Sequence, residues 1–354
     1  MKTARMLIIL VLTLCMCVGV ANADFTFGEP TNLARLAGSG TIYGGYISPD
    51  GLSVYFGAIR AGGYGSYDIW VVLRETTDDD WGAPVNLGPT VNTAYSEYPT
   101  NISADGLSLY IGEYNSPRPG GYGSYDIWVT TRETTDDDWG EPVNLGPMVN
   151  SAYGEIASVI STDGLSLYVQ SNRPGTFGGT DIWVATRETT DDDWGEPVNL
   201  GSTVNSSSSS WDAGGSTDGL ALFFDSTRPG GYGNWDVWMV TRPTTSDPWG
   251  SPVNLGSAIN TSANDWWPSI SRDGSTFYFL RQGSGIWQAP IIPIVDLNRD
   301  GIVDSADMCI IVDHWGEDYP LCDIGPMPWG DGIVDVQDLI VLAEHLFEEI
   351  PPAE

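Results

Sequence analysis

Residues 119–145 read PGGYGSYDIWVTTRETTDDDWGEPVNL, and copies of this stretch recur along most of the chain. Each repeat also carries an Asp-Gly pair, and successive pairs are 55, 58, 55 and 55 residues apart. A β-rich unit of this length cannot bury its own apolar faces, so it must stack on its neighbours; a closed ring of blades is the usual solution. The pairs are Asp50-Gly51, Asp105-Gly106, Asp163-Gly164, Asp218-Gly219 and Asp273-Gly274.

Each repeat contains four short runs of β-forming residues. In the second repeat they cover residues 98–103, 107–111, 126–131 and 142–145. Apolar and aromatic residues fill the runs, whereas Gly, Pro, Asn and Asp gather between them. Residues 24–290 show no helical periodicity. We therefore expect four strands per repeat.

The N-terminus is out of phase with the repeat. Residues 27–33 read FGEPTNL and match WGEPVNL at 139–145, the fourth run of a repeat. The last repeat ends after its third run, at Gly285-Ile286-Trp287. The N-terminal strand can therefore complete the last blade, which removes two open sheet edges. The sequence thus predicts an all-β, five-bladed propeller closed by its N-terminus, over residues 24–290.

Residues 1–23 have the pattern of a secretory signal peptide. Lys2 and Arg5 precede an apolar run over 6–20, and Ala21-Asn22-Ala23 forms a small-residue cleavage site. The run is short for a membrane span, and no later stretch is long and apolar enough. We expect a soluble mature protein that is secreted or held at the cell surface or in the periplasm.

The chain is strongly acidic. It has 14 basic and 47 acidic residues and a net charge of −33, and loss of Lys2 and Arg5 with the signal makes the charge −35. Every remaining cation is an arginine. Such a surface repels nucleic acid and anionic membrane, so neither is expected as a partner.

The phrases S-x-D-G and R-P-G-G-Y-G-x-Y-D-I-W resemble the WD40-like (PD40) β-propeller repeats of the TolB family. The resemblance covers residues 25–290. It implies the propeller fold and, for the family, mostly binding of proteins or cell-envelope polymers. It says little about chemistry, because propellers host many functions.

Residues that recur in every blade are expected to be structural, since blades bury their surfaces against one another. An aspartate before each third run should cap a turn or bond a neighbouring strand, and two tryptophans per repeat should pack between blades or at the outer strand. The aspartates are Asp68, Asp126, Asp181 and Asp236; the tryptophans are Trp70, Trp128, Trp183, Trp238, Trp81, Trp139, Trp194 and Trp249.

Strand alternation assigns the loops to two faces. The Asp-Gly turns share one face with the acidic triplets at 78–80, 136–138 and 191–193, which we interpret as a solvated rim. The other face is the candidate ligand face, because its loops vary between blades. It presents Arg60, Arg118, Arg173 and Arg228, with Tyr64, Tyr122, Phe177 and Tyr232. Such groups suit sugars or peptide segments, although each arginine could instead form an ion pair within its blade.

Catalysis has little support in the sequence. Both histidines, His314 and His345, lie outside the ring, so the ring lacks a Ser-His-Asp or histidine-metal constellation. A glycoside hydrolase remains the alternative, because it needs only two carboxylates at a suitable separation. The candidates begin the inner strands: Glu97, Glu155, Asp212 and Asp265.

Residues 296–307, DLNRDGIVDSAD, carry the strongest chemical motif. Oxygen ligands fall at loop positions 1, 3, 5, 9 and 12, with glycine at 6, which is the spacing of a calcium loop. Hard oxygen ligands select Ca²⁺ over softer metals. The expected ligands are Asp296, Asn298, Asp300, the Ile302 carbonyl, Asp304 and Asp307. The alternative is an empty turn.

A second, imperfect copy follows an apolar helix. Its late ligands match at Asp331, the Ile333 carbonyl, Asp335 and Asp338, but Met327 and Trp329 occupy positions 1 and 3. Asp323 could replace position 1 only if residues 325–329 bulge out. Occupancy of this site is therefore doubtful. Cys309 and Cys322, the cysteines left after export, could pair in an oxidising compartment; the alternative is two free thiols.

Two calcium loop-helix units of this kind resemble a type I dockerin, over residues 294–350. The resemblance implies a calcium-folded helical domain that docks onto a cohesin module, with loop positions 10 and 11 facing the partner. Here these positions are Ser305-Ala306 and Val336-Gln337, and because the pairs differ, symmetric docking in two modes is in doubt.

Together these features predict an exported, non-catalytic recognition protein. Its ring would contact a polysaccharide or an envelope protein, and its tail would attach it to a cohesin-type partner. The alternatives are a polysaccharide-degrading component that uses ring carboxylates, and a ring that only spaces other parts of an assembly.

Overall fold

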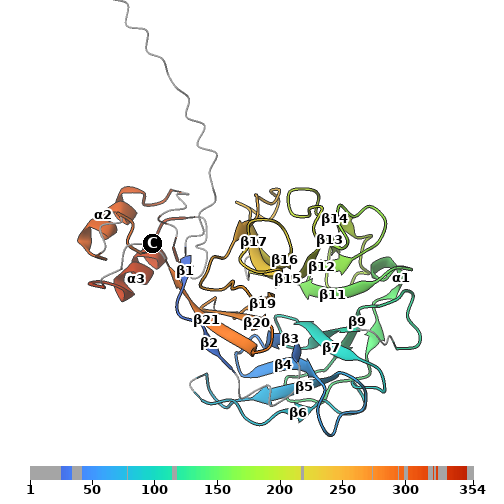
Figure 1. Ribbon diagram of the computed structural model, residues 1–354. Coiled ribbons are helices and arrows are strands. Elements are labelled where there is room, and N and C mark those ends of the chain that lie inside the picture. The colour runs from blue at the N-terminus through green and yellow to red at the C-terminus, as the bar shows by residue number, and fades with distance from the viewer. Residues whose placement is uncertain are drawn as a thin grey trace, which may run out of the picture.

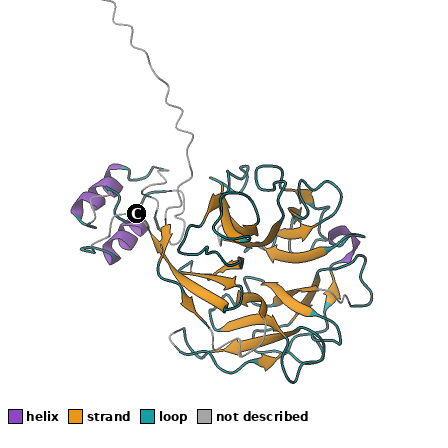
Figure 2. Cartoon of the chain, in the orientation of Figure 1, coloured by secondary structure: helices purple, strands orange, loops and turns teal. Residues whose placement is uncertain are grey.

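The computed structural model describes residues 25–33, 42–77, 79–113, 118–216, 219–272, 274–293, 295–298, 302–317, 322, 324–325 and 333–348. Five antiparallel sheets lie around a common axis, and the helices of the tail lie outside this ring on the side of β1 (Figures 1 and 2). The five-bladed propeller predicted from the repeat is confirmed. The signal segment over residues 1–23 lies outside the described residues.

Each of the first four blades has four strands, numbered outward from the axis. Blade 1 holds β3 (Ile42–Ile47), β4 (Ser53–Ala58), β5 (Asp68–Leu73) and β6 (Val85–Asn86). Blade 2 holds β7 (Glu97–Ile102), β8 (Ser108–Glu113), β9 (Trp128–Thr131) and β10 (Val143–Asn144). Blade 3 holds β11 (Glu155–Ile160), β12 (Ser166–Ser171), β13 (Asp181–Thr186) and β14 (Val198–Asn199). Blade 4 holds β15 (Ser210–Gly215), β16 (Ala221–Ser226), β17 (Asp236–Thr241) and β18 (Val253–Asn254).

Blade 5 closes the ring as the sequence predicts. It holds β19 (Asp265–Ile270), β20 (Thr276–Arg281) and β21 (Gly285–Pro293), and the N-terminal strand β2 (Thr31–Asn32) pairs with β21. Asn32 lies opposite Trp287 just as Asn144 lies opposite Trp128 in blade 2. β21 continues past residue 290, because β1 (Phe25–Phe27) pairs with its last residues. A single helical turn, α1 (Gly146–Val149), follows β10.

The Asp-Gly turns join the first two strands of each blade. In blade 2, Gly106 adopts φ +73°, a left-handed conformation that glycine reaches without steric cost. Asp105 fixes the turn because its carboxylate accepts hydrogen bonds from the Leu107 amide and the Ser103 hydroxyl. The same contacts recur at Asp50 and Asp163.

The core lies between blades. Five apolar clusters each combine side chains of two neighbouring blades, including the pair formed by blades 5 and 1. The third-strand tryptophans are only 7–8% exposed, so their structural role is confirmed; they are Trp70, Trp128, Trp183 and Trp238. The second tryptophan of each repeat lies beneath an arginine, with the guanidinium 4.2–4.3 Å from the ring centroid. Such contacts stabilise by about 0.5–2 kcal/mol each.

The tail contains α2 (Ser305–Asp313) and α3 (Val336–Glu344) around a separate apolar cluster. Both helices begin with a capping box: Asp304 with Asp307, and Asp335 with Asp338. The two halves also exchange backbone hydrogen bonds, between Val303 and Glu348 and between Val334 and Glu317. Among the described residues, no helix is long and apolar enough to cross a membrane.

Candidate functional site

The loop between the second and third strands is held rigidly in blades 1–4. In blade 1, the Asp68 carboxylate accepts hydrogen bonds from the Tyr64 amide (2.6 Å), the Gly65 amide (2.9 Å) and the Asn86 side chain (2.9 Å). Asn92 in turn bonds both backbone groups of Ile69. Asp126, Asp181 and Asp236 make the equivalent loop contacts. The capping role expected for these aspartates is confirmed.

Each loop held by these aspartate hydrogen bonds carries one aromatic ring at its tip. The four side chains are between 51% and 53% exposed, although apolar residues of this size usually pack into a core. We call this set the aromatic rim and the face that bears it the rim face. The aromatic rim consists of Tyr64, Tyr122, Phe177 and Tyr232. Blade 5 has only a short turn over residues 282–284 at this place, so the rim is interrupted there.

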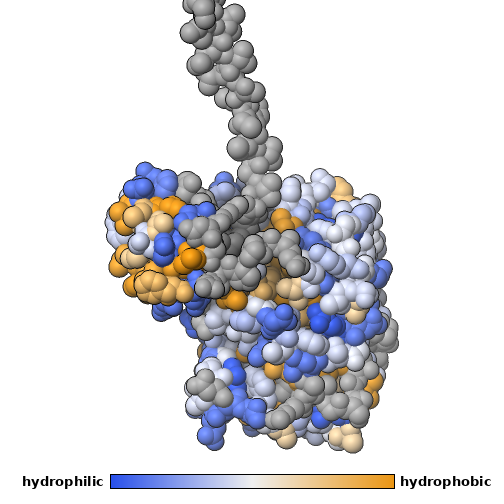
Figure 3. Space-filling view, turned by 60° about the vertical axis from the view of Figure 1, so that its left-hand side comes forward, coloured by the Kyte–Doolittle hydropathy of each residue, from blue (hydrophilic) through white to orange (hydrophobic). Residues whose placement is uncertain are grey.

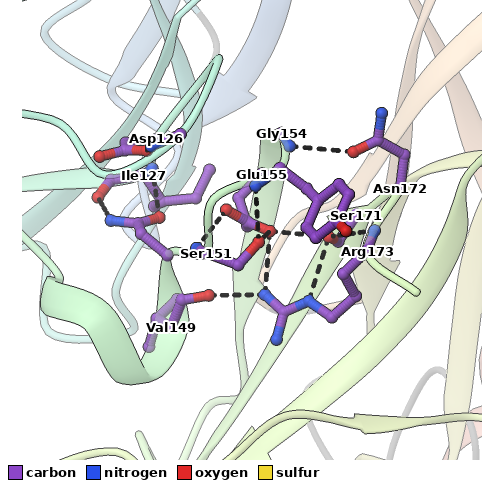
Figure 4. A network of polar contacts seen from close by, with 12 residues as sticks. Asp126, Ile127, Val149, Ser151, Gly154, Glu155, Ser171, Asn172 and Arg173 are labelled. Atoms are coloured by element: carbon purple, nitrogen blue, oxygen red, sulfur yellow. Dashed lines mark hydrogen bonds and ion pairs between the residues drawn. The ribbon is translucent and has the colours of Figure 1, made fainter. Parts of the chain in front are cut away.

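The arginines of the rim face hold blades together. In blade 3, the Arg173 guanidinium donates to the Val149 carbonyl (2.6 Å), the Glu155 carboxylate (3.0 Å) and the Ser171 hydroxyl (3.1 Å) (Figure 4). It also lies over the Trp183 ring. Because Val149 belongs to the connection from blade 2, the arginine joins two blades. Its Nε and Nη2 thus donate to protein groups.

The other rim-face arginines follow this pattern. Arg118 contacts the Val91 carbonyl and pairs with Glu97 at 3.2 Å, and Arg228 donates to the Val204 carbonyl at 2.6 Å. Arg60 lies over the Trp70 ring. Ion pairing within the blade, the alternative interpretation, therefore describes Arg118 and Arg173. Their participation in ligand binding would require these internal contacts to break.

Arg281 plays the same role in blade 5, where the sequence offers no R-P-G motif to reveal it. Its Nε lies 2.7 Å from the Asp265 carboxylate, and its Nη2 donates to the Ile259 carbonyl at 2.8 Å. Arg281 ends β20 rather than lying in the following loop. Arg281 could have been predicted only from the pairing of the first two strands of the blade. In that pairing Asp265 lies opposite Arg281, just as Glu155 lies opposite Ser171 in blade 3.

Three of the four candidate catalytic carboxylates are wholly buried. Glu97, Glu155 and Asp265 each begin an inner strand and are 0% exposed. Each accepts hydrogen bonds from the backbone and hydroxyl of a Thr or Ser four residues earlier, and each pairs with an arginine of its own blade. Glycoside hydrolysis needs carboxylates that reach the scissile bond. The side chain of Asp212 lies outside the described residues.

Blade 2 carries an extra buried carboxylate, Glu113, that the sequence analysis missed. It lies opposite Glu97 in the sheet and is 1% exposed. The Arg118 guanidinium lies 3.2 Å from Glu97 and 3.5 Å from Glu113, so one cation serves two acids. Burial raises the pKa of Glu113 to about 7 and also raises the pKa of Glu97.

We expect the blade 2 acids to make the ring less stable as pH rises. Because the pKa of Glu113 is raised in the folded state, folding favours its protonated form, and this contribution is lost between the unfolded pKa of about 4.3 and the folded pKa of about 7. At about pH 8 the Glu113→Gln variant should therefore be more stable than the wild type, with a free energy of unfolding higher by about 1–2 kcal/mol. At about pH 5 the two proteins should be equally stable.

The matched control for this prediction is Glu133→Gln, which alters an exposed carboxylate of the same blade. Urea denaturation at both pH values measures the free energy of unfolding. Equal pH dependence in the Glu113→Gln and Glu133→Gln variants would show that Glu113 is ionised in the folded ring at neutral pH.

The tail places its two helix-capping aspartates identically. Asp307 accepts hydrogen bonds from the Asn298 amide (3.0 Å) and the Asp304 amide (2.9 Å). Asp338 accepts from the Gly325 amide (2.8 Å) and the Asp335 amide (2.6 Å). Both carboxylates are 0% exposed, and no described basic side chain pairs with either. A buried carboxylate of this kind fits a bound cation.

These contacts also align the two loops. Gly325 takes the place of Asn298, so Asp323 corresponds to Asp296 at position 1. Burial agrees, because Leu297 and Ile324 are 5% and 2% exposed. The stretch from Gly325 to Asp338 is therefore longer than the stretch from Asn298 to Asp307, while the expected bulge over residues 325–329 lies mostly outside the described residues. Asp300, Asp323 and Asp331 lie outside the described residues, and no three described Asp, Glu, His or Cys side chains gather as a metal site.

The expected disulfide is not formed in the structure. Cys309 and Cys322 are both free thiols. Cys309 is exposed on α2, whereas Cys322 lies in the tail core, where desolvation raises its thiol pKa to about 11. Cys322 corresponds to the buried Val295 of the first loop, which explains why it points into the core.

The expected docking residues lie on the first turns of the tail helices. Ser305, Ala306, Val336 and Gln337 are all exposed. Apolar side chains are exposed near them, and Figure 3 shows hydrophobic residues gathered on the surface of the tail. They include Ile302, Val312, Trp315, Ile333, Ile340 and Phe347. Clusters of exposed apolar residues are typical of interaction surfaces.

The ring of five sheets defines a five-bladed β-propeller, and comparison with known proteins agrees. No protein-family model and no curated protein matches the chain. TolB from Acinetobacter baumannii is 14% identical, with a TM-score of 0.44, over 75% of this chain and 63% of that protein. An α-L-arabinofuranosidase from Podospora anserina is 13% identical, with a TM-score of 0.50, over 77% of this chain and 98% of that protein.

A second α-L-arabinofuranosidase, from Lactobacillus brevis, is 13% identical with a TM-score of 0.47, over 74% of this chain and 94% of that protein. Similarity at this level shows the fold alone. The function must therefore be argued from the residues of this chain, because propellers host many functions.

Proposed function

We propose that this protein is an exported, non-catalytic binding protein whose ring holds a neutral polysaccharide through the aromatic rim. The observation that carries the proposal is the aromatic rim itself. These rings are about half exposed, and the backbone of the loops that carry them is held by hydrogen bonds to buried aspartates, so little backbone entropy is lost when a ligand stacks on the rings. Aromatic rings of this kind provide large, rigid contact areas.

The charge of the chain supports a neutral ligand. The net charge of −33 repels anionic polymers and anionic surfaces. The arginines that could attract an anion on the rim face are engaged inside the blades. The rim face therefore offers aromatic rings and backbone groups, which favours an uncharged polymer with many hydroxyl groups.

The same contacts argue against the hydrolase alternative. A general acid must donate a proton to the leaving oxygen, and a nucleophile or base must face the sugar. Glu97, Glu155 and Asp265 are instead surrounded by donors of their own blades and excluded from solvent. The ring thus has the framework of a binding protein.

We further propose that the tail folds around calcium and attaches the protein to a cohesin-type module. The carboxylates of Asp307 and Asp338 would provide the last ligand of each loop, with the remaining oxygens coming from the preceding residues. Bound calcium would neutralise the repulsion between the clustered acids. The exposed first turns and apolar residues of the tail support the docking role.

The direct test incubates the calcium-loaded mature protein with insoluble cellulose, xylan and mannan, and measures both retention and new reducing ends. Retention without cleavage is expected. New reducing ends that disappear in the Glu155→Gln variant would establish a hydrolase instead. Failure to bind any of the three polymers would contradict the polysaccharide proposal and favour a protein ligand or a spacer role.

Removing the aromatic rim should abolish retention without unfolding the ring. Burying an aromatic side chain against a ligand contributes about 1.5–3 kcal/mol, so replacing Tyr64, Tyr122, Phe177 and Tyr232 with alanine together should weaken binding by at least about tenfold. Depletion isotherms on the retaining polymer measure the affinity. Trp315→Ala is the control, because it removes an exposed aromatic residue from the tail. An equal loss in both variants would exclude the rim as the binding surface.

A further inference from the structure

Helix α3 of the tail is apolar on two opposite faces. Its inner face packs in the tail core, where Val341 and Leu342 are buried. Its outer face carries a second apolar row, spaced by four, three and four residues, which places the row along one side of a helix. This row, which we call the α3 stripe, consists of Val336, Ile340, Ala343 and Phe347, all of them exposed. A helix that is apolar on every side is normally buried on every side, so we expect a partner to cover the stripe.

The corresponding row on α2 has a different character. The two helices correspond through their capping boxes, in which Asp304 matches Asp335. The positions equivalent to the α3 stripe are occupied by Ser305, Cys309, Val312 and Gly316. Of these four residues, Val312 alone has a large aliphatic side chain. A continuous apolar surface is therefore present on the α3 half of the tail and not on the α2 half.

Phe347 ends the α3 stripe in a strained backbone conformation. It adopts φ +72°, and its counterpart Gly316 adopts φ +80°. Both amides make the same contact with the other half of the tail: Phe347 donates to the Val303 carbonyl at 2.7 Å, and Gly316 donates to the Val334 carbonyl at 2.8 Å. Glycine reaches this left-handed region without steric cost, whereas a bulky residue is strained in it. The chain thus keeps a strained residue whose ring is 82% exposed, and such strain is concentrated at functional sites.

The charge of the tail indicates the chemistry of the partner. Residues 294–354 contain 15 acidic residues, one arginine and two histidines. A second copy of the chain would bring the same acids against the stripe, and their repulsion disfavours that occupant. The exposed acids Glu344 and Glu348 adjoin Ala343 and Phe347 in the stripe. A different protein, apolar at the centre of its docking surface and basic at the edge, complements both features.

We propose that such a protein module covers the α3 stripe in one orientation only, with Phe347 as its anchor. The inference rests on the proposed attachment of the tail to a cohesin-type module, and it specifies the face of the tail and the chemistry of the module. A few aromatic residues near the centre of an interface usually carry most of the binding energy. Because α2 has neither an equivalent row nor an equivalent ring, placing α2 where α3 docks would not present the same surface.

The decisive variant is Phe347→Gly, which gives this position the residue of its counterpart Gly316. Because glycine relieves the left-handed strain, the tail should unfold at the same temperature as the wild type or a higher one, while its affinity for the partner falls. A residue that only supported the fold would show the opposite. Ile340→Ser tests the middle of the stripe, and Cys309→Ser is the matched control at the equivalent exposed position of α2.

Surface plasmon resonance of the calcium-loaded mature protein over immobilised type I cohesin modules measures the affinity. Scanning calorimetry measures the unfolding of the tail, and sedimentation velocity measures self-association. We expect a monomer that binds at least one cohesin module, with Phe347→Gly and Ile340→Ser at least tenfold weaker and Cys309→Ser within twofold of the wild type.

Three results would overturn the inference, and they are distinguishable. Wild-type affinity in Phe347→Gly, or an equal effect of Ile340→Ser and Cys309→Ser, would exclude the single orientation while leaving the attachment intact. Binding to none of the cohesin modules would contradict the attachment itself and the inference with it. A wild-type dimer that Phe347→Gly dissociates would assign the α3 stripe to a second copy of the chain.

Discussion

Replacing Glu155 with alanine should lower the free energy of unfolding of the ring by about 3–5 kcal/mol, because it leaves a buried cation without its counter-charge. Glu155 is 0% exposed and accepts bonds from Ser151, Ser171 and Arg173 (Figure 4). Arg173 would keep its bond to the Val149 carbonyl and its contact with Trp183. The Ser151 hydroxyl and amide would lose their acceptor, which adds to the cost.

Urea denaturation followed by tryptophan fluorescence measures this effect at neutral pH with calcium present. Glu188→Ala is the control, because it removes an exposed carboxylate of the same blade and should change the free energy by less than about 0.5 kcal/mol. If Glu155→Ala costs less than about 1 kcal/mol, Glu155 does not hold the blades together. Loss of a measurable hydrolytic activity in such a stable variant would reassign Glu155 to catalysis.

Blade 4 shows how the ring functions without this carboxylate. Ser210 stands where blade 3 has Glu155, and no described carboxylate pairs with Arg228. The Arg228 guanidinium lies over two aromatic rings, at 4.7 Å from Phe224 and 5.3 Å from Trp238. Burial lowers the pKa of Arg228 to about 10. The arginine of blades 2 to 5 thus always lies over an aromatic ring, and in blades 2, 3 and 5 it also forms an ion pair.

The features of the fold that repeat were predictable from the sequence, and those that depend on neighbouring blades were not. The Asp-Gly period and the phase of residues 27–33 predicted the five blades and their closure, because both are local patterns. The inward direction of Arg118 and Arg173 was not predictable, since it depends on carbonyls that the connection from another blade provides. Glu113 was missed for a different reason, because only the register of β7 and β8 within blade 2 places it opposite Glu97.

The tail also contains a feature that the sequence alone could not place, although the residues involved are close together in the chain. A calcium loop could be proposed at Asp296 from the sequence because the spacing of its acidic residues is regular. The corresponding position in the second loop became evident only from the hydrogen bond between the Gly325 amide and Asp338. Spacing alone aligned Met327 with Asp296 and Trp329 with Asn298, whereas the hydrogen bonds of the structure align Gly325 with Asn298. When residues are inserted within a loop, ligand positions can no longer be assigned by counting along the sequence.

Replacing Asp307 with alanine should abolish the calcium-dependent stability of the tail while leaving the ring intact. In a calcium loop the last acidic ligand both binds the ion and fixes the helix that follows. Asp307 already fixes the helix, because it accepts bonds from the Asn298 and Asp304 amides. An ion that binds only the folded tail stabilises it by about 4 kcal/mol at a concentration a thousand times its Kd.

Scanning calorimetry with calcium and with a chelator should show two transitions in the wild-type protein, of which only that of the tail moves. Asp307→Ala should give a tail transition as low with calcium as the wild type gives with chelator. Asp313→Ala, an exposed acid on the same helix, should behave as the wild type. The Asp338→Ala variant tests whether the longer second loop also binds calcium. If it does, Asp338→Ala should reduce the calcium-dependent shift of the tail transition as much as Asp307→Ala does. If calcium still raises the tail transition fully in the Asp307→Ala variant, the ion binds elsewhere. Calcium would then not act by relieving the repulsion among Asp296, Asp304 and Asp307.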